Sequence, residues 1–168
     1  MKGAEDVTIR SATPADAAQL TAIYNHYVKD TIVTFEEEPV SASEMSRRID
    51  EVQSSSLPWL VAARDGDVVG YAYATKWRPR FGYRFSVEVT VYLAPDQARR
   101  GIGSGLFEAL VAGLRDRRLH AAMGGIALPN DASVALHEKF GFRKVAHFDQ
   151  VGLKFGKWID VGYWQLIL

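Results

Sequence analysis

The stretch from Val87 to Leu106, written VEVTVYLAPDQARRGIGSGL, constrains the fold more than any other part of the chain. In its first half apolar residues alternate with Glu88, Thr90 and Tyr92, the period-two pattern of a strand with one core face and one polar face. The apolar positions are Val87, Val89, Val91 and Leu93. Pro95 cannot donate to a ladder, so we expect the strand to end there.

A glycine loop and a helix follow this strand. Gly101, Gly103 and Gly105 precede apolar residues at helical spacing. These are Leu106, Phe107, Leu110, Val111 and Leu114. A strand, a glycine loop and a helix N-terminus together form an anion site from backbone N–H groups. Glu88 places a carboxylate on the strand that leads into this loop, and this combination indicates chemistry on a phosphorylated ligand.

Other glycine-loop sites fit these residues less well. A dinucleotide site would have G-x-G-x-x-G with an acidic residue about 20 positions later, and no such acid ends a strand here. A nucleotide-triphosphate loop would need Gly-Lys-Ser/Thr, which is absent from the sequence. From the loop alone, the alternative remains that these glycines form a tight turn that binds no ligand.

The composition excludes several classes of function. The chain has 168 residues, 48% hydrophobic residues, zero formal net charge and no cysteine. Disulfides, thiolate metal sites and a cysteine acyl intermediate are therefore excluded, and nucleic acid is a poor partner. The N-terminal residues do not resemble a targeting peptide, and no apolar run suits a membrane span. We expect a single domain over residues 1–168, located in the cytoplasm.

Period and turn signals predict the element order βααβββαβαββ, a mixed α/β sheet with one helix-crossed parallel step. Ser43 is expected to cap the second helix, and Asn130 or Asp131 the last one. Strands are predicted at Val7–Arg10, Trp59–Arg64, Val68–Trp77, Val87–Leu93, Ala121–Leu128, Arg143–Phe148 and Ile159–Leu168. The loop between the last two contains Gly152, Gly156 and Trp158. The paired Gly124 and Gly125 predict close backbone approach or splaying.

Several of these segments resemble one known family. ARRGIGSG, with Asn130, Ser133, Leu136, His137 and Gly141-Phe142, resembles the acetyl-CoA motifs of GCN5-related (GNAT) N-acetyltransferases. YNHYV, WRPRFGY, LPNDASVALHEKFGF and GLKFGKWIDVGYWQL are similar to the phosphinothricin and methionine sulfoximine acetyltransferase group. One position departs from the superfamily pattern, because Ala98 stands where Gln or Arg is usual.

The resemblance implies a single-domain, mostly antiparallel sheet of about seven strands, splayed centrally, with about four helices. It also implies acetyl-CoA as co-substrate, no metal, and pantetheine lying in the splay. Main-chain groups of Val91, Tyr92 and Leu93 would bind pantetheine and polarise the thioester carbonyl. The pyrophosphate would bind to Arg99, Arg100, Gly101, Ile102, Gly103 and Ser104. Asn130 would bind pantetheine, and Ser133 the phosphate region of CoA.

An amine attacks a thioester only when it is neutral, so the site needs a base. Glu88 is the expected base, since partial burial on the polar face would raise its pKa, and it matches the family's glutamate. Pairing with Arg84 or Arg78 in a structural role is the alternative. His137 occupies the helix position of the family's proton donor, and could instead be an ordinary structural histidine.

The acceptor is expected to be a small amino-acid-like amine of the phosphinothricin, methionine sulfoximine or methionine sulfone type. Arg78 and Arg80 could bind its α-carboxylate, or be solvated surface charges. The expected acceptor wall comprises Phe35, Pro79, Tyr83, Glu88, Val89, Thr90 and Tyr92. A protein N-terminus or polyamine as acceptor, and a non-catalytic acyl-CoA-binding module, are the rival hypotheses. The family suggests a homodimer.

Overall fold

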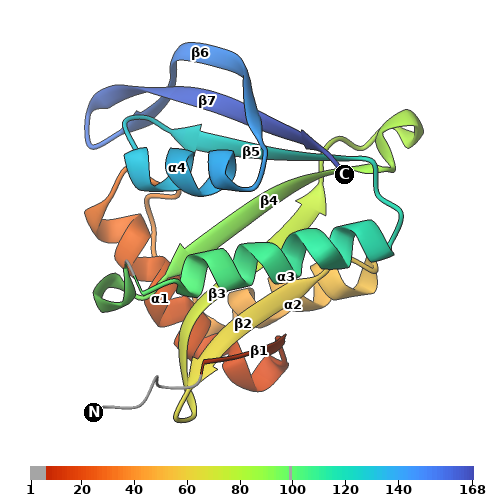
Figure 1. The fold of residues 1–168 in the computed structure, drawn as a ribbon. Helices are drawn as coiled ribbons and strands as arrows, with labels where there is room; N and C mark the ends of the chain where they lie inside the picture. The colour runs from red at the N-terminus through yellow and green to blue at the C-terminus, as the bar shows by residue number, and fades with distance from the viewer. Residues whose placement is uncertain (1–6, 99) are drawn as a thin grey trace.

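The structure is a computed structural model that describes residues 7–98 and 100–168. These residues form seven strands and four α-helices in the predicted order, which confirms the expected fold class (Figure 1). The elements are β1 (Thr8–Ser11), α1 (Ala17–Asp30), α2 (Ala42–Ser54), β2 (Trp59–Arg64), β3 (Asp67–Lys76), β4 (Ser86–Leu93), α3 (Ile102–Asp116), β5 (Ala121–Ala127), α4 (Asp131–Lys139), β6 (Arg143–Lys154) and β7 (Lys157–Ile167).

The sheet has the order β1-β2-β3-β4-β5-β7-β6, and it opens at its centre. β4 and β5 pair in parallel between Ser86–Glu88 and Ala121–Met123. Beyond Glu88, β4 continues to Leu93 along β3, and β5 continues to Ala127 along β7. The two strands therefore diverge, and the predicted splay is confirmed.

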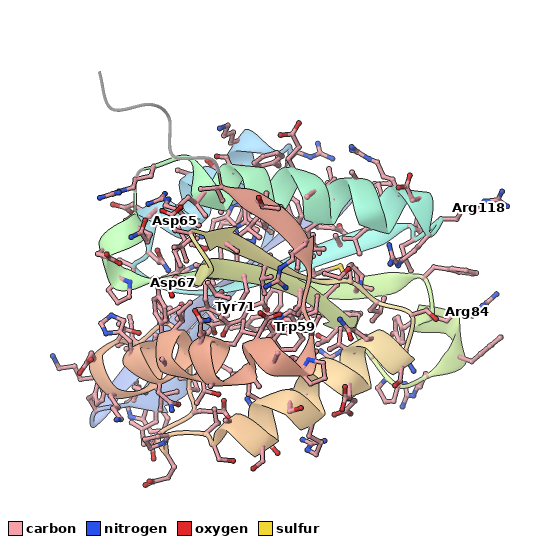
Figure 2. The ribbon with its side chains drawn as sticks, turned by 90° about the horizontal axis from the view of Figure 1, so that it is seen from below. Trp59, Asp65, Asp67, Tyr71, Arg84 and Arg118 are labelled. Carbon is pink, nitrogen blue, oxygen red and sulfur yellow. The ribbon has the colours of Figure 1, made fainter. Side chains whose placement is uncertain are left out.

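Helices cover both faces of the β1–β4 half of the sheet. Figure 2 shows α3 on one face and α1 with α2 on the other, with Trp59 and Tyr71 on the α1–α2 side. Leu106, Leu110 and Leu114 of α3 are completely buried, as their spacing predicts. No helix of the described residues is both long and apolar enough for a membrane crossing.

Tyr92 differs from its predicted place on a polar strand face. Its side chain is only 8% exposed. The rings of Tyr24 and Tyr27 in α1 pack against it, with centroids at 5.4 Å and 4.9 Å. The alternating face of β4 is therefore polar toward Glu88 and aromatic under α1, because α1 covers only one end of the strand.

Two local predictions were wrong. Ser41, not Ser43, caps α2, and its hydroxyl accepts a hydrogen bond from the backbone N–H of Glu44 at 3.1 Å. The predicted loop between the last strands is mostly a longer hairpin, since β6 and β7 enclose a turn at Phe155 and Gly156, both at positive φ. The longer arms carry side chains to the cavity described below.

Candidate active site

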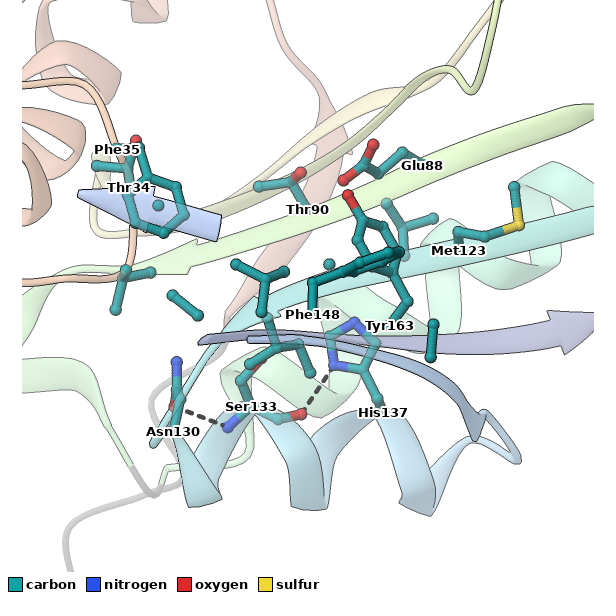
Figure 3. A pocket seen from close by; sticks show the side chains of 18 of the residues that line it. Thr34, Phe35, Glu88, Thr90, Met123, Asn130, Ser133, His137, Phe148 and Tyr163 are labelled. Carbon is teal, nitrogen blue, oxygen red and sulfur yellow. Dashed lines mark hydrogen bonds between the residues drawn. The ribbon is translucent and has the colours of Figure 1, made fainter. Parts of the chain in front are cut away.

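A cavity of about 890 Å³ occupies the splay between β4 and β5. Its walls come from β4, β5, α4, the β6–β7 hairpin and the α1–α2 loop, residues 31–41. Figure 3 shows Thr34 and Phe35 on one side of this space and His137, Ser133 and Asn130 on another. The splay therefore brings together segments that are distant in the sequence.

Glu88 lies where β4 and β5 part, and it lines the cavity. Its side chain is half-buried, and burial raises its pKa, while the positive charge of nearby Arg78 opposes that shift. A Cβ on Gly125 would lie 3.0 Å from Glu88 Oε1. The absence of a side chain at Gly125 thus leaves room for the Glu88 carboxylate beside β5.

Tyr163 on β7 is a site residue that the sequence reasoning missed. A Cβ on Gly125 would also lie 3.0 Å from its ring, so Tyr163 and Glu88 flank the same point, and Figure 3 shows them pointing toward one another. The rings of Trp77 and Phe148 pack edge-on against Tyr163, at 5.4 Å and 5.9 Å. Burial and the charge of Glu88 raise the pKa of Tyr163, so its hydroxyl stays protonated at neutral pH.

His137 also lines the cavity, but only 3% of the residue is exposed. Its Nδ1 lies 2.8 Å from the carbonyl oxygen of Ser133, which can only accept, so Nδ1 carries the hydrogen. Nε2 is buried without a partner and faces Gly124, where a Cβ would come within 2.3 Å. Burial lowers the pKa of His137, and the neutral ring has no proton on Nε2 to donate.

The N-terminus of α3 lies where the sequence predicts an anion cradle, although residues 100–104 are not among those that line the cavity. Gly101 precedes it at φ +78°, and the first backbone N–H groups, at residues 102–104, have no acceptor within the helix. The Lys139 ammonium reaches from α4 to donate to Ser104 Oγ at 2.9 Å. Lys139 was missed in the sequence because only the fold places α4 beside α3. These groups fit the phosphates of a coenzyme A ester.

Of the other residues that the sequence predicts to bind acetyl-CoA, some line the cavity and one does not. Val91, Asn130 and Ser133 line the cavity, as does Tyr92. The Asn130 side-chain oxygen accepts the Ser133 N–H at 3.1 Å, so it caps α4 as predicted. Leu93 is not among the lining residues. Its carbonyl accepts a hydrogen bond from the Tyr27 hydroxyl at 2.6 Å.

Three residues of the expected phosphate loop have less definite roles. Arg99 lies outside the described residues. Arg100 is exposed beside the cradle, and Ile102 is buried, so Ile102 contributes its backbone only. Gln97 does not replace the usual side chain at Ala98, because its amide binds Arg64 and Asp96 at 3.1 Å and 2.9 Å.

The residues that the sequence predicts to bind the acceptor also fall into two groups, those that line the cavity and those that do not. Phe35, Arg78, Val89 and Thr90 line the cavity. Pro79, Arg80 and Tyr83 do not, because the segment after Arg78 leaves the sheet in an exposed turn that includes the 3₁₀ residues Phe81–Tyr83. Arg78 is therefore the arginine of this segment that lines the cavity.

One group of potential metal ligands lies outside the cavity, on the hairpin. Ligand atoms of His147, Asp149 and Asp160 lie within 4.8 Å of one another. The sequence spacing had not indicated this group. The Lys144 ammonium lies 3.1 Å from Nδ1 of the same imidazole, and Asp160 binds Nε2 at 2.8 Å, so hydrogen bonds within the chain account for the arrangement.

Comparison with known proteins agrees with this geometry. Residues 9–162 match the family model described as Acetyltransferase (GNAT) domain. The phosphinothricin N-acetyltransferase of Streptomyces coelicolor is 38% identical, over 98% of each chain. The L-methionine sulfoximine/L-methionine sulfone acetyltransferase of Pseudomonas paraeruginosa is 38% identical, over 96% of this chain and 94% of the relative.

Solved structures agree equally well. A phosphinothricin acetyltransferase from Sinorhizobium meliloti in complex with acetyl-CoA superposes with a TM-score of 0.93 and 35% identity, over 96% of this chain and 88% of that one. A ribosomal-protein-alanine N-acetyltransferase from Brucella melitensis gives a TM-score of 0.94 and 40% identity, over 96% and 99%. Sequence and structure thus confirm the resemblance, and the chain belongs to the GNAT family of acetyltransferases, as an N-acetyltransferase with acetyl-CoA as co-substrate.

Proposed function

We propose that this enzyme acetylates the α-amine of a small amino acid of the phosphinothricin, methionine sulfoximine or methionine sulfone type. The observation that carries the proposal is the position of Glu88, a partly buried carboxyl that lines the cavity where β4 and β5 part. The names of the relatives from Streptomyces coelicolor and Pseudomonas paraeruginosa support this acceptor class.

In this mechanism Glu88 accepts the proton that the acceptor ammonium must lose before it can react, since aliphatic amines have pKa values near about 10. Acetyl-CoA supplies the acetyl group as a thioester. Backbone groups of β4 at Val91 and Tyr92, which line the cavity, hold the donor and polarise its carbonyl. The absence of cysteine excludes a cysteinyl acyl intermediate, and the proposed transfer is direct, from the thioester to the amine.

His137 has the second role in the proposal. Its Nε2 is buried beside Gly124, whereas Glu88 is partly exposed and lines the cavity. An amine can therefore reach Glu88 but not Nε2, which favours Glu88 as the main proton acceptor. With its Nδ1 hydrogen donated to Ser133 and no hydrogen on Nε2, His137 has no proton to donate to a ligand, and its role in the proposal is to pack against Phe107 and Phe142.

The binding residues follow from the same placement. Arg78 binds the acceptor carboxylate, with Phe35, Val89 and Thr90 lining the pocket. On the donor side, Asn130 and Ser133 contact pantetheine and the phosphate region. Residues 99–104 and Lys139 hold the pyrophosphate. Arg80, Pro79 and Tyr83 have at most an outer role, since the structure keeps them out of the cavity.

A thiol-release assay with acetyl-CoA tests the function. The amine panel comprises methionine sulfone, methionine sulfoximine, phosphinothricin, free methionine, spermidine and a peptide with N-terminal alanine. We expect turnover with the first three at least tenfold above the last two. Equal turnover with all amines, or none with any, would contradict the proposal.

A protein N-terminus is the second candidate acceptor, because the similar structure from Brucella melitensis is a ribosomal-protein-alanine N-acetyltransferase. The peptide in the panel separates this candidate from the first. A polyamine is disfavoured by Arg78 at the cavity, since it would repel a cationic acceptor. A non-catalytic binding module would bind acetyl-CoA but release no thiol.

The homodimer and the cytoplasmic location belong to the same proposal. Large apolar side chains are exposed along the β6–β7 hairpin, and patches of this kind often mark interfaces. They are Val145, Phe148, Val151, Leu153, Phe155 and Trp158. Light scattering and cell fractionation test the two points. No nucleic-acid or membrane partner is part of the proposal.

A further inference from the structure

Lys154, the last residue of β6, is completely buried although its side chain is cationic. Its ammonium donates hydrogen bonds to the backbone carbonyl oxygens of Thr34 at 2.7 Å and Glu36 at 2.8 Å. Lysine is almost never fully buried unless its charge is satisfied, because desolvation of the ion is costly. An apolar residue would avoid the cost of burying the ion but would leave the two carbonyl oxygens without these donors, so the lysine has a bonding role here.

The segment that Lys154 binds forms the acceptor side of the cavity. Thr34 and Phe35, in the α1–α2 loop, both line it. The Phe35 ring lies directly on Gly152 of β6, where a Cβ would come within 2.2 Å of the ring. The loop and the hairpin are therefore in contact at the cavity rim, with Lys154 immediately behind that contact.

The other side of the loop is fixed to the helices. Thr34 Oγ1 lies 2.9 Å from the hydroxyl of Tyr24 in α1. The Glu36 carboxylate accepts two hydrogen bonds from Arg48 of α2, at 2.6 Å and 2.9 Å. Tyr24 also donates to Glu36. These bonds hold the loop to the body of the protein, and Lys154 links the same two residues to the hairpin.

We propose that Lys154 is a positioning residue for the acceptor. It fastens the hairpin to the α1–α2 loop and thereby fixes Phe35 across the cavity from Thr90 and Glu88. Lys154 is not itself among the lining residues, so it acts through Thr34 and Phe35. This inference rests on the proposed function, because it assigns the loop side of the cavity to the acceptor.

The test is Lys154→Met, which keeps the length of the side chain and removes its donors. Lys157→Met is the matched control, since Lys157 is an exposed lysine at the start of β7, three residues after Lys154. We expect Lys154→Met to raise KM for methionine sulfone about tenfold, with KM for acetyl-CoA changed less than about twofold. A parallel rise of both values, or no change in either, would overturn the inference.

A second variant covers the case in which Lys154→Met does not fold. Gly152→Ala places a methyl group against the Phe35 ring without altering Lys154, and we expect it to produce the same selective rise in acceptor KM. An unchanged acceptor KM in a folded Gly152→Ala protein would show that the position of Phe35 does not matter for the acceptor.

Amide hydrogen exchange distinguishes failure of this inference from failure of the proposed function. In Lys154→Met we expect residues 31–40 to exchange faster than in Lys157→Met, while α3 exchanges as in the parent protein. Unchanged amide hydrogen exchange over residues 31–40 would show that Lys154 does not hold the α1–α2 loop to the hairpin. If the parent protein acetylates no amino acid, the proposed function fails, whereas the exchange data still decide whether Lys154 holds the loop.

Discussion

The two walls of the central cavity are built in different ways. On the proposed donor side, β4 lines the cavity and is followed directly in sequence by the glycine loop and the first turn of α3, so the groups proposed to bind acetyl-CoA are largely backbone. On the proposed acceptor side, side chains converge from the α1–α2 loop, the segment directly after β3, β4 and the β6–β7 hairpin. The donor wall therefore depends on local conformation, and the acceptor wall on contacts between distant segments.

This contrast predicts that acceptor-wall variants change acceptor kinetics or chemistry, and donor-wall variants change the use of acetyl-CoA. Glu88→Gln should have the largest effect. It removes the base from the point where the walls meet, so we expect kcat/KM to fall by about 10²–10⁴-fold while KM for acetyl-CoA is preserved. Steady-state thiol release measures both. Retained turnover would remove Glu88 from its role.

The same variant should not be less stable at neutral pH. Burial raises the folded-state pKa of Glu88 above that of the unfolded chain, so the folded state binds the proton more tightly. Between the two pKa values, stability falls as pH rises, and above both the ionised carboxyl is destabilising. Glu88→Gln should then equal or exceed the parent in Tm at pH 7. A clear loss of Tm would indicate a structural role for the carboxylate.

Arg78→Met should raise KM for methionine sulfone about tenfold, because a charged hydrogen bond to the carboxylate is lost. Arg80→Met is the matched control, since Arg80 is exposed in the same segment but does not line the cavity. Kinetics with methionine sulfone and with its amide, which lacks the carboxylate, compare the two variants. Equal effects of both substitutions would contradict the placement of the acceptor carboxylate.

On the donor wall, Gly101→Ala should raise KM for acetyl-CoA about fivefold without changing acceptor KM. Nothing would touch the new Cβ, but Gly101 has φ +78°, where an L-residue costs about 1–2 kcal/mol. Gly66→Ala is the control, with φ +91° and open space in the β2–β3 turn. It should lower Tm similarly and leave both KM values unchanged. A rise in acceptor KM for Gly101→Ala would contradict the separation of donor and acceptor binding between the two walls.

The smallest kinetic effect is expected from His137→Asn. The asparagine amide can replace Nδ1–H toward Ser133, and the lost Nε2 is out of reach of the amine. We expect kcat within about fivefold of the parent, with stability reduced by about 1–3 kcal/mol from the gap between Phe107 and Phe142. A loss of kcat as large as that of Glu88→Gln would instead make His137 the main base.

The donor wall could be predicted from sequence because its signals are local. Alternation along β4, the glycine loop and the stripe of α3 each lie within one short window, and Asn130 caps α4 as expected. The paired glycines Gly124 and Gly125 also marked the splay correctly. Even so, a local signal can be ambiguous: Ser41 and Ser43 both suit a helix cap, and the wrong one was chosen.

The acceptor wall could be predicted only in part. Phe35 and Thr90 were expected there and line the cavity, but Tyr163 was not anticipated. Its relation to Glu88 depends on the pairing of β5 with β7, which no short-range pattern encodes. Arg80 was expected there and lies outside, because the turn after Arg78 sets the direction of the segment. The burial of Lys154 likewise follows from a contact between segments far apart in the chain.

The most direct test of the account is a crystal structure with coenzyme A and methionine sulfone bound together. We predict the pyrophosphate on the first turn of α3, pantetheine between β4 and β5, and the acceptor amine about 2.6–3.2 Å from the Glu88 carboxylate, directly or through one water. An amine bound beyond reach of Glu88, or coenzyme A bound outside the splay, would contradict it.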